Sequence, residues 1–425
     1  MRKGAARATG MRHAFSPGKP GRVGPADRLS EIFGRANNAT TASTDTAPDG
    51  AARGPLARLR DLLGLAPAPA NATVNATANA TAPPAPVAAP AATVACVTWN
   101  LAADSPGKKD CAFLKDLRRH DLVCVGVQEL EDLKPRRTPG HRAEAWTKLL
   151  DAAFPPKSFA KVADRSAGPV RLSVFQKRKK PFIRVTGCEV ADVACGIGNV
   201  LRNKGCAAAF LDVEVADDSS KKKTAVRLCV IASHLAAHAH KVKDRNDDYW
   251  RICRELLQDA PVAWKGRCAD VEGERQTSGR AALLDAADLV LFCGDLNYRL
   301  DLPRGEAERG ALLGDLEELY DYDQLRREKA AGRAFGGFLE GRVWGFRPTF
   351  KFDARSDRYD SSKKLRVPSW TDRVLYDPAR YVPRRRIAAT PRLSPGYSVV
   401  PRRAAPRLRR LILRGYAAAA TFDIP

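Results

Sequence analysis

The sequence predicts an α/β fold, in which two packed mixed sheets form a sandwich with helices on the outside. Two observations support this prediction. From residue 94 onward, short apolar runs typical of strands alternate with longer stretches of helical periodicity. In addition, 44% of the 425 residues are hydrophobic, which is enough for one large core. Alternation of this kind favours sheets covered by helices.

The expected strands are runs of about four to nine residues rich in Val, Ile, Leu, Ala and Cys. They lie at 94–99, 122–127, 170–176, 207–215, 225–232, 288–293 and 373–376, and a last one at 417–424. The expected helices have apolar residues three or four positions apart between charged ones. They lie at 112–119, 142–153, 244–257, 304–320 and 323–331.

Residues 1–92 are predicted to be a disordered, basic region rich in Ala, Pro, Asn and Thr, with a short helix at 56–65. The first 26 residues carry six Lys or Arg and no acid. They fit either an organelle transit peptide or a basic disordered start. The folded domain is expected to span 93–425.

The chain has a net charge of +24, which favours an acidic partner such as a phosphate compound or an anionic lipid. Residues 379–425 alone hold eleven Arg and one Asp, with few aromatic residues between them, so nucleic acid is not expected as a partner. Ten cysteines occur without a Cys-x-x-Cys pair. Unpaired cysteines of this kind favour a reducing compartment, and the sequence has no apolar run long enough to span a membrane. We therefore expect a cytoplasmic protein, and we expect it to be a monomer.

Polar side chains recur where the expected strands end. Asp295 and Asn297 directly follow the run 289–293, and Asn100 and Glu129 follow the first two strands. Residues two apart on an extended chain point to the same side, and strand ends are where sheets expose functional side chains. Glu129 and Asn100 offer the hard oxygen ligands that suit Mg²⁺, although Glu129 alone could be a solvated acid.

The remaining polar residues each allow two interpretations. Asp295 could be the base for a water molecule or a turn Asp, and Asn297 could donate to a phosphoryl group or form a turn. His234 could bind a phosphate oxygen or be a satisfied half-buried His. Asp372 could act in catalysis or pair with Arg373 at the surface. Their joint occurrence at strand ends favours phosphate ester hydrolysis.

Nine motifs in order resemble those of the inositol polyphosphate 5-phosphatase catalytic domain, within the endonuclease/exonuclease/phosphatase superfamily. They are TWN (98–100), QE (128–129), NKG (203–205), SHLAAH (233–238), RNxDY (245–249), GDLNYR (294–299), DQL (323–325), FxPTFK (346–351) and PSWTDR (368–373). The resemblance covers about residues 93–394. It implies a four-layer α/β sandwich and Mg²⁺-dependent hydrolysis of the 5-phosphate of phosphoinositides or soluble inositol polyphosphates by direct attack of water.

The resemblance also implies roles for thirteen residues. The catalytic set is Asp295, Asn297, His234 and Asp372, and the residues that hold Mg²⁺ are Glu129 and Asn100. The substrate-binding set is Asn203, Lys204, His238, Arg245, Tyr249, Lys351 and Arg373. Phe350 stands where the family usually has Tyr, so one hydroxyl contact is lost.

One family motif, a C-terminal Ser-Asp-His before the last strand, is absent, because no His follows residue 240. The resemblance implies that the Asp372 position orients this His, which stabilises phosphoryl charge. A basic, Pro-containing insertion at about 395–415 takes its place. A misjoined gene model or a true loss would each explain this. In the second case the protein would be an impaired, inositol-phosphate-binding pseudoenzyme. Arginines and leucines at 402–414 would suit peripheral contact with an anionic membrane, unless this stretch is an artefact.

Overall fold

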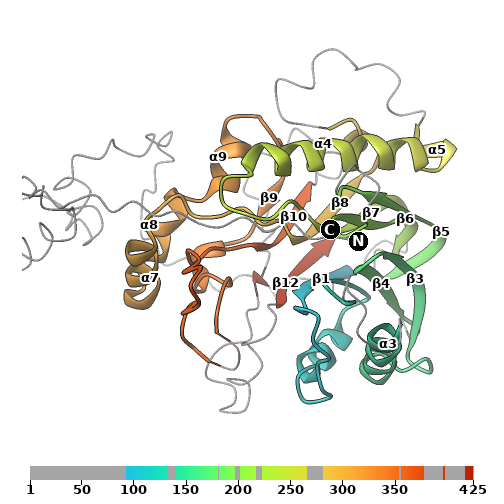
Figure 1. The fold of residues 1–425 in the computed structure, drawn as a ribbon. Coiled ribbons are helices and arrows are strands. Elements are labelled where there is room, and N and C mark those ends of the chain that lie inside the picture. Colours follow the sequence, from blue (N-terminus) through green and yellow to red (C-terminus); the bar gives the residue numbers. More distant parts are fainter. Residues whose placement is uncertain are drawn as a thin grey trace, which may run out of the picture. The chain divides into compact units, whose positions relative to one another are not determined.

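The computed structural model describes residues 92–131, 140–179, 181–196, 202–216, 223–265, 281–353, 356–377, 396–397 and 417–424 (Figure 1). The predicted disordered region 1–92 lies outside the described residues except for residue 92, as does the short helix expected at 56–65. The basic insertion at about 395–415 also lies outside them, apart from residues 396 and 397.

The first sheet has six strands in the order β11-β12-β1-β2-β4-β3. Their bounds are Gly396–Tyr397 (β11), Ala417–Ile424 (β12), Ala92–Asn100 (β1), Leu122–Gln128 (β2), Val170–Lys177 (β4) and Phe159–Ala167 (β3). β1 runs parallel to β2 and antiparallel to β12, in a register that places Ala92 opposite Ile424. The strand predicted at 417–424 is therefore confirmed and completes this sheet beside β1.

The second sheet has six strands in the order β5-β6-β7-β8-β10-β9. Their bounds are Ile183–Ala194 (β5), Gly205–Ala216 (β6), Lys223–His234 (β7), Leu289–Asp295 (β8), Asp372–Asp377 (β10) and Leu339–Glu340 (β9). β7 and β8 are parallel, and β10 returns antiparallel to β8. Both sheets are thus mixed, as predicted.

The two sheets pack face to face on a dry core of alternating strand residues. Many of these residues are small, including Cys96 and Cys124 of the first sheet and Ala232 of the second, all fully buried. Gly126 of β2 lies where the sheets approach closely, since a Cβ there would be 2.7 Å from the Cβ of Ala232. The thin interior explains why these strands are rich in Ala and Cys.

Helices cover the outer face of each sheet (Figure 1). The 3-10 helix η1 (Ala112–Arg119) and α3 (His141–Ala153) pack on the first sheet. The helices α4 (Val242–Asp259), α5 (Val262–Lys265) and α6 (Leu283–Ala286) pack on the second. A further cluster involves α7 (Arg304–Leu313), α8 (Leu316–Asp321) and the 3-10 helix η4 (Val343–Gly345), and α9 (Gln324–Ala330) adds Leu325 to the second-sheet core. The four-layer sandwich is therefore confirmed.

Two details differ from the sequence-based expectation. The helix predicted over 304–320 is two helices, because Gly314 adopts a left-handed conformation with φ of 94° and ends α7. The sequence analysis also misses β3 and β5, because their outer positions are largely polar and exposed, and it misses the short elements β9, β11, α5 and α6. No helix in the described part of the chain is long and apolar enough to cross a bilayer. The nine cysteines among the described residues are free thiols.

Candidate active site

The strands of both sheets deliver polar side chains to one edge of the sandwich. In the first sheet, Asn100 ends β1 beside the end of β2, and Glu129 follows. In the second, His234 at the end of β7 pairs in register with Asp295 at the end of β8. Asp372, the first residue of β10, lies opposite Asp295 across the antiparallel pair. The polar residues that follow these strands in the sequence therefore lie together in space.

A cavity of about 600 Å³ opens at this edge. Nine of the thirteen predicted site residues line it: Asn100, Glu129, Lys204, His234, His238, Asp295, Asn297, Lys351 and Asp372. Its wall also includes cationic residues that sequence reasoning did not single out: Arg299, Lys364 and Arg366. Arg299 ends the GDLNYR motif, and the other two belong to the Lys-Lys-Leu-Arg run at 363–366, which is the signal that could have found them.

Asp295 is the most constrained carboxylate of the cavity. Its Oδ2 accepts from Asn100 Nδ2 at 2.9 Å and lies 3.4 Å from His234 Nε2, and its Oδ1 accepts from the Asn297 backbone N–H at 3.1 Å. Burial raises the pKa of Asp295, but the bond with His234 and the positive charges of His234 and Lys204 outweigh this and lower it to about 2. Asp295 is thus ionised and fixed in place at neutral pH.

Asn100 joins the two sheets at the cavity floor. Its Nδ2 donates to Asp295 Oδ2 in one sheet and, at 3.2 Å, to Glu129 Oε1 in the other. Glu129 has a left-handed backbone with φ of 52°, and its side chain is 44% exposed. An exposed carboxylate on a strained backbone beside an amide is a suitable start for a cation site.

No group of three or more His, Cys, Asp or Glu side chains in the described residues is arranged to hold a metal. Mg²⁺ does not need such a group, because it commonly binds one or two carboxylates and completes its shell with water and substrate phosphate. The carboxylate of Glu129 therefore fits Mg²⁺ better than a metal that requires a closed cage of protein ligands. Asn100 would contribute its Oδ1, which also accepts from the Ala102 N–H at 2.9 Å, because its Nδ2 donates to Glu129 and Asp295.

Lys204 projects into the cavity from the residue before β6. Its Nζ contacts His234 Nε2, the same ring nitrogen that lies 3.4 Å from Asp295 Oδ2. Burial lowers the pKa of Lys204, while the nearby carboxylates Asp295 and Glu129 act in the opposite direction. A cation held this deep beside two carboxylates would favour an anionic ligand oxygen.

Arg299 fixes the orientation of Asn297. Its Nη2 donates to Asn297 Oδ1 at 2.8 Å and its Nε donates to the Asn297 carbonyl at 3.0 Å. Asn297 Nδ2 then donates to the carbonyl of Leu235 at 3.0 Å and keeps one N–H beyond that bond. The Arg299 guanidinium lies 3.9 Å from the centre of the Phe350 ring, and burial lowers the pKa of Arg299 to about 10. Phe350 thus supports Arg299 through its flat face.

Asp372 is buried, and only one of its two carboxylate oxygens has hydrogen-bond donors among the described residues. Its Oδ2 accepts from Thr349 Oγ1 at 2.9 Å and Thr371 Oγ1 at 3.2 Å. Its Oδ1 has no hydrogen-bond partner among the described residues. Burial and the neighbouring charge of Asp295 raise the pKa of Asp372 well above its usual range. A buried carboxylate oxygen without a donor is costly and marks the place of a missing partner.

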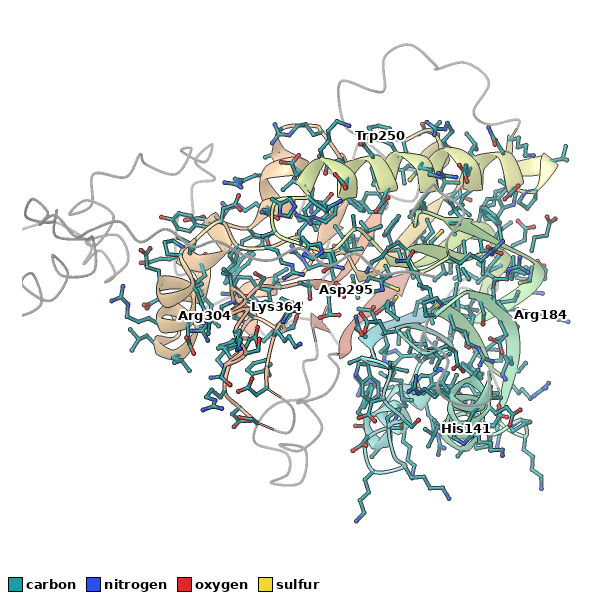
Figure 2. All side chains as sticks on the ribbon, viewed as in Figure 1. His141, Arg184, Trp250, Asp295, Arg304 and Lys364 are labelled. Carbon is teal, nitrogen blue, oxygen red and sulfur yellow. The ribbon has the colours of Figure 1, made fainter. Side chains whose placement is uncertain are left out.

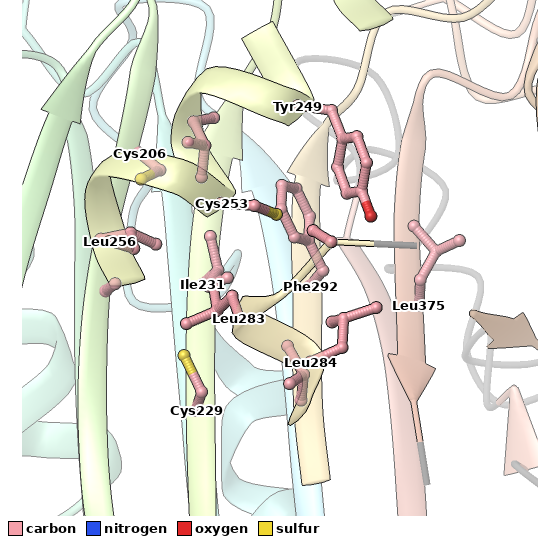
Figure 3. Close-up of a cluster of buried hydrophobic side chains, with 14 of the residues drawn as sticks. Cys206, Cys229, Ile231, Tyr249, Cys253, Leu256, Leu283, Leu284, Phe292 and Leu375 are labelled. Atoms are coloured by element: carbon pink, nitrogen blue, oxygen red, sulfur yellow. The ribbon is translucent and has the colours of Figure 1, made fainter. Parts of the chain in front are cut away.

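Four predicted substrate residues do not line the cavity. Tyr249 lies on the buried side of α4, and its ring centre is 4.1 Å from that of Phe335 (Figure 3). The expectation that it faces substrate is therefore wrong. Arg245 is also fully buried and donates to the carbonyls of Ala236, His238 and Ala239, so it holds the cavity loop instead.

Arg373 faces away from the cavity because neighbouring residues of a strand point to opposite sides. It is 1% exposed and its guanidinium donates to Asp323 and Glu340, which is a structural ion cluster and corrects its assignment to a ring phosphate. Asn203, next to Lys204, is half-buried and outside the cavity lining. The PSWTDR motif therefore contains both a scaffold residue, Arg373, and a cavity residue, Asp372, whereas no residue of the RNxDY motif lines the cavity.

Residues 97–388 match the endonuclease/exonuclease/phosphatase family 2. The chain belongs to this family. It is 38% identical to synaptojanin-1 of Homo sapiens over 261 residues, which are 60% of this chain and 14% of that protein. It is 31% identical to the type II inositol 1,4,5-trisphosphate 5-phosphatase of Mus musculus over 290 residues, which are 66% of this chain and 26% of that protein.

Among solved structures, the fold matches the inositol polyphosphate 5-phosphatase domain of SPsynaptojanin, in complex with inositol (1,4)-bisphosphate and calcium ion. The TM-score is 0.55 at 26% identity, and the match covers 78% of this chain and 84% of that one. These family relatives confirm the resemblance inferred from the motifs. The family match ends at residue 388, ahead of the basic insertion.

Proposed function

We propose that this protein hydrolyses the 5-phosphate of phosphoinositides or soluble inositol polyphosphates in a Mg²⁺-dependent reaction. The observation that carries the proposal is the convergence, in one cavity, of an oxygen-donor pair, an ionised Asp and several cations. Relatives named as inositol 5-phosphatases support the substrate class.

The cavity residues differ in chemistry, and each group of them suits a different role in hydrolysis. Asp295 would orient the attacking water and accept its proton, since it is ionised and held by three donors. Asn297 and His234 would hold the scissile phosphate and stabilise its charge in the transition state. Glu129 and Asn100 would hold Mg²⁺, which when bound neutralises phosphate charge and polarises the phosphoryl group.

The cations suit a ligand with several phosphates. Lys204 lies deep beside His234, while Lys351 is exposed and lies with Lys364 in the cavity wall. One phosphate would not need cations at both depths, whereas a ring with adjacent phosphates would engage them together. Lys204 would therefore bind near the reacting phosphate and Lys351 would bind a neighbouring ring phosphate.

A second candidate is an impaired enzyme that captures inositol phosphates. It is favoured by Asp372, whose Oδ1 has no donor among the described residues, together with the absence of any His after residue 240. Loss of a group that stabilises phosphoryl charge lowers the rate by orders of magnitude without removing binding.

The test measures phosphate release from an inositol polyphosphate that carries a 5-phosphate and from an isomer that lacks it, with Mg²⁺ or with chelator. The first candidate requires release from the 5-phosphorylated compound only, and only with Mg²⁺. Tight binding by calorimetry without release would favour the second. If the transcript across residues 375–425 encodes Ser-Asp-His ahead of β12, the second candidate loses its basis.

A further inference from the structure

A short loop at the cavity mouth, residues 360–366, is built around one buried carboxylate; we name it the rim loop. Asp360 is 2% exposed, and it accepts from the backbone N–H groups of Ser362 at 3.1 Å and Arg366 at 3.0 Å. Its carbonyl accepts from Arg304 Nη2 at 2.9 Å. These bonds tie both ends of the loop to the scaffold and fix its shape.

The rim loop presents an apolar side chain to solvent. Leu365 is 53% exposed, although it lies beside a polar cavity. It also adopts a left-handed backbone with φ of 37°, which is unfavourable for a bulky residue. Of the exposed large apolar residues in the described part of the chain, Leu365 alone lines the cavity. Exposure and strain together cost free energy, and the fixed loop maintains both.

The charges around Leu365 are positive and available. Lys363 and Lys364 precede it, and Lys351 lies on the same cavity wall; all three are exposed and form no ion pair within the described ranges. Two acids of residues 353–366 are engaged internally, and a third, Asp357, is exposed. Asp360 binds the rim loop, and Asp353 accepts from Arg358 at 3.0 Å. The rim loop thus exposes one apolar side chain, Leu365, next to two lysines, Lys363 and Lys364, of which Lys364 is labelled in Figure 2.

We propose that the rim loop docks the cavity mouth on an anionic lipid bilayer, with Leu365 inserted among the acyl chains and the surrounding lysines at the headgroups. A single leucine is too small to anchor a stable protein partner, which needs several hundred Å² per side. A bilayer has no such requirement, because apolar insertion and attraction to anionic headgroups add side chain by side chain. The inference rests on the proposed function, because it makes a phosphoinositide in the bilayer the substrate that reaches the cavity.

The first test uses the full chain and vesicles without phosphoinositide, so that docking is measured independently of turnover. Phosphatidylcholine vesicles with and without phosphatidylserine are sedimented with the parent protein, Leu365→Ser and Val262→Ser. Val262 is a matched control, because it is 84% exposed on α5 and outside the cavity lining. We expect Leu365→Ser to weaken binding to the phosphatidylserine vesicles about tenfold and Val262→Ser to leave it unchanged.

Other basic segments of the chain are the same in all variants, so the difference between the two Ser variants isolates the rim loop. Lys363→Gln should weaken binding by a smaller factor that disappears at high salt. Equal binding by Leu365→Ser and the parent protein, with thermal unfolding showing all variants folded, would overturn the proposal. Equal weakening by both Ser variants would overturn it as well.

A second measurement reads the position of the side chain directly. Leu365→Trp is compared with Val262→Trp for quenching by lipids brominated in the acyl chains. The proposal requires added quenching only for the residue 365 variant. If that tryptophan stays unquenched while the protein is bound to vesicles, another surface docks and the rim loop does not. If phosphate release fails but this quenching occurs, the proposed function fails and the docking surface stands.

Discussion

Asp372 and Arg373 are neighbours on β10, yet they lie in opposite kinds of environment. Arg373 is surrounded by partners, because its guanidinium donates to both Asp323 and Glu340. Asp372 faces the cavity, and one of its oxygens has no partner among the described residues. Both side chains are almost fully buried, so burial alone does not distinguish them.

The difference lies in how completely each buried charge is satisfied. A saturated ion cluster holds the scaffold together and has no capacity left for a ligand. An unsatisfied carboxylate costs stability, and it is retained where chemistry or binding uses it. On this basis we propose that the cavity face of β10 serves binding or catalysis and that the opposite face stabilises the scaffold. Predictions that separate activity from stability test this division.

The largest expected effect is on the cavity side. Asp295→Ala should lower kcat by about a thousandfold or more, because the attacking water loses its orienting carboxylate. The variant should remain folded and unfold cooperatively in urea, with some loss of stability at neutral pH, because the lowered pKa of Asp295 shows that its ionised carboxylate is stabilised in the folded state. Turnover within tenfold of the parent protein would contradict the role of Asp295.

The next effect should appear on the structural side. Arg373→Met should lower the free energy of unfolding by about 3 kcal/mol, because it leaves Asp323 and Glu340 buried without their cation. Urea denaturation measures this, with Arg184→Met on exposed β5 as the control, which should change stability by less than about 0.5 kcal/mol. A fall in binding affinity for inositol phosphates without loss of stability would instead return Arg373 to the substrate site.

A smaller effect is expected at the cavity wall. Lys351→Ala should raise KM several-fold, by roughly 1 kcal/mol of binding, for substrates with adjacent ring phosphates. Substrates with a single ring phosphate should be affected less, because they leave Lys351 without a phosphate to bind. Steady-state kinetics on the two classes measure the difference. An equal rise for both would remove Lys351 from this role.

The smallest effect concerns Asp372 and pH. Because the pKa of Asp372 is raised in the folded state, the folded protein binds more protons than the unfolded chain above the ordinary Asp pKa. The parent protein should therefore lose stability as pH rises from about 4 toward neutrality, through this group. For Asp372→Asn, the free energy of unfolding in urea without metal should depend less on pH over that range. A parallel pH dependence in both proteins would show that Asp372 ionises normally.

Much of the fold follows from local patterns in the sequence. The strands of the inner layers are apolar on both faces, and all those predicted are present, including the one at 417–424. β3 and β5 escaped prediction because one face of each is in water, so few apolar residues mark them. The break between α7 and α8 depended on Gly314, whose isolated occurrence in a helical pattern is ambiguous.

The site was predictable where residues end a strand, and less so where they stand inside a motif. Asp295, Asn100 and His234 could be identified from the sequence because each stands at the end of a predicted strand, where a sheet exposes polar side chains. The sequence could not show which side chains of a motif face the cavity and which face the core. Tyr249 and Arg373 were assigned to substrate because they belong to motifs shared with the family, but the helix and the strand turn them into the core. Only the three-dimensional alternation of faces resolves this.

The narrow interior of the sandwich sets the distance between the polar groups that the two sheets contribute to the cavity. The first sheet contributes Asn100 and Glu129 to the polar set and the second contributes Lys204, His234, Asp295 and Asp372; Asn100 bridges the two sheets by donating to Asp295 at 2.9 Å. That reach depends on the layer of small side chains below it, where Gly126 leaves no room for even one methyl group beside Ala232. The spacing between cation-binding and water-binding groups is therefore set by residues that touch neither.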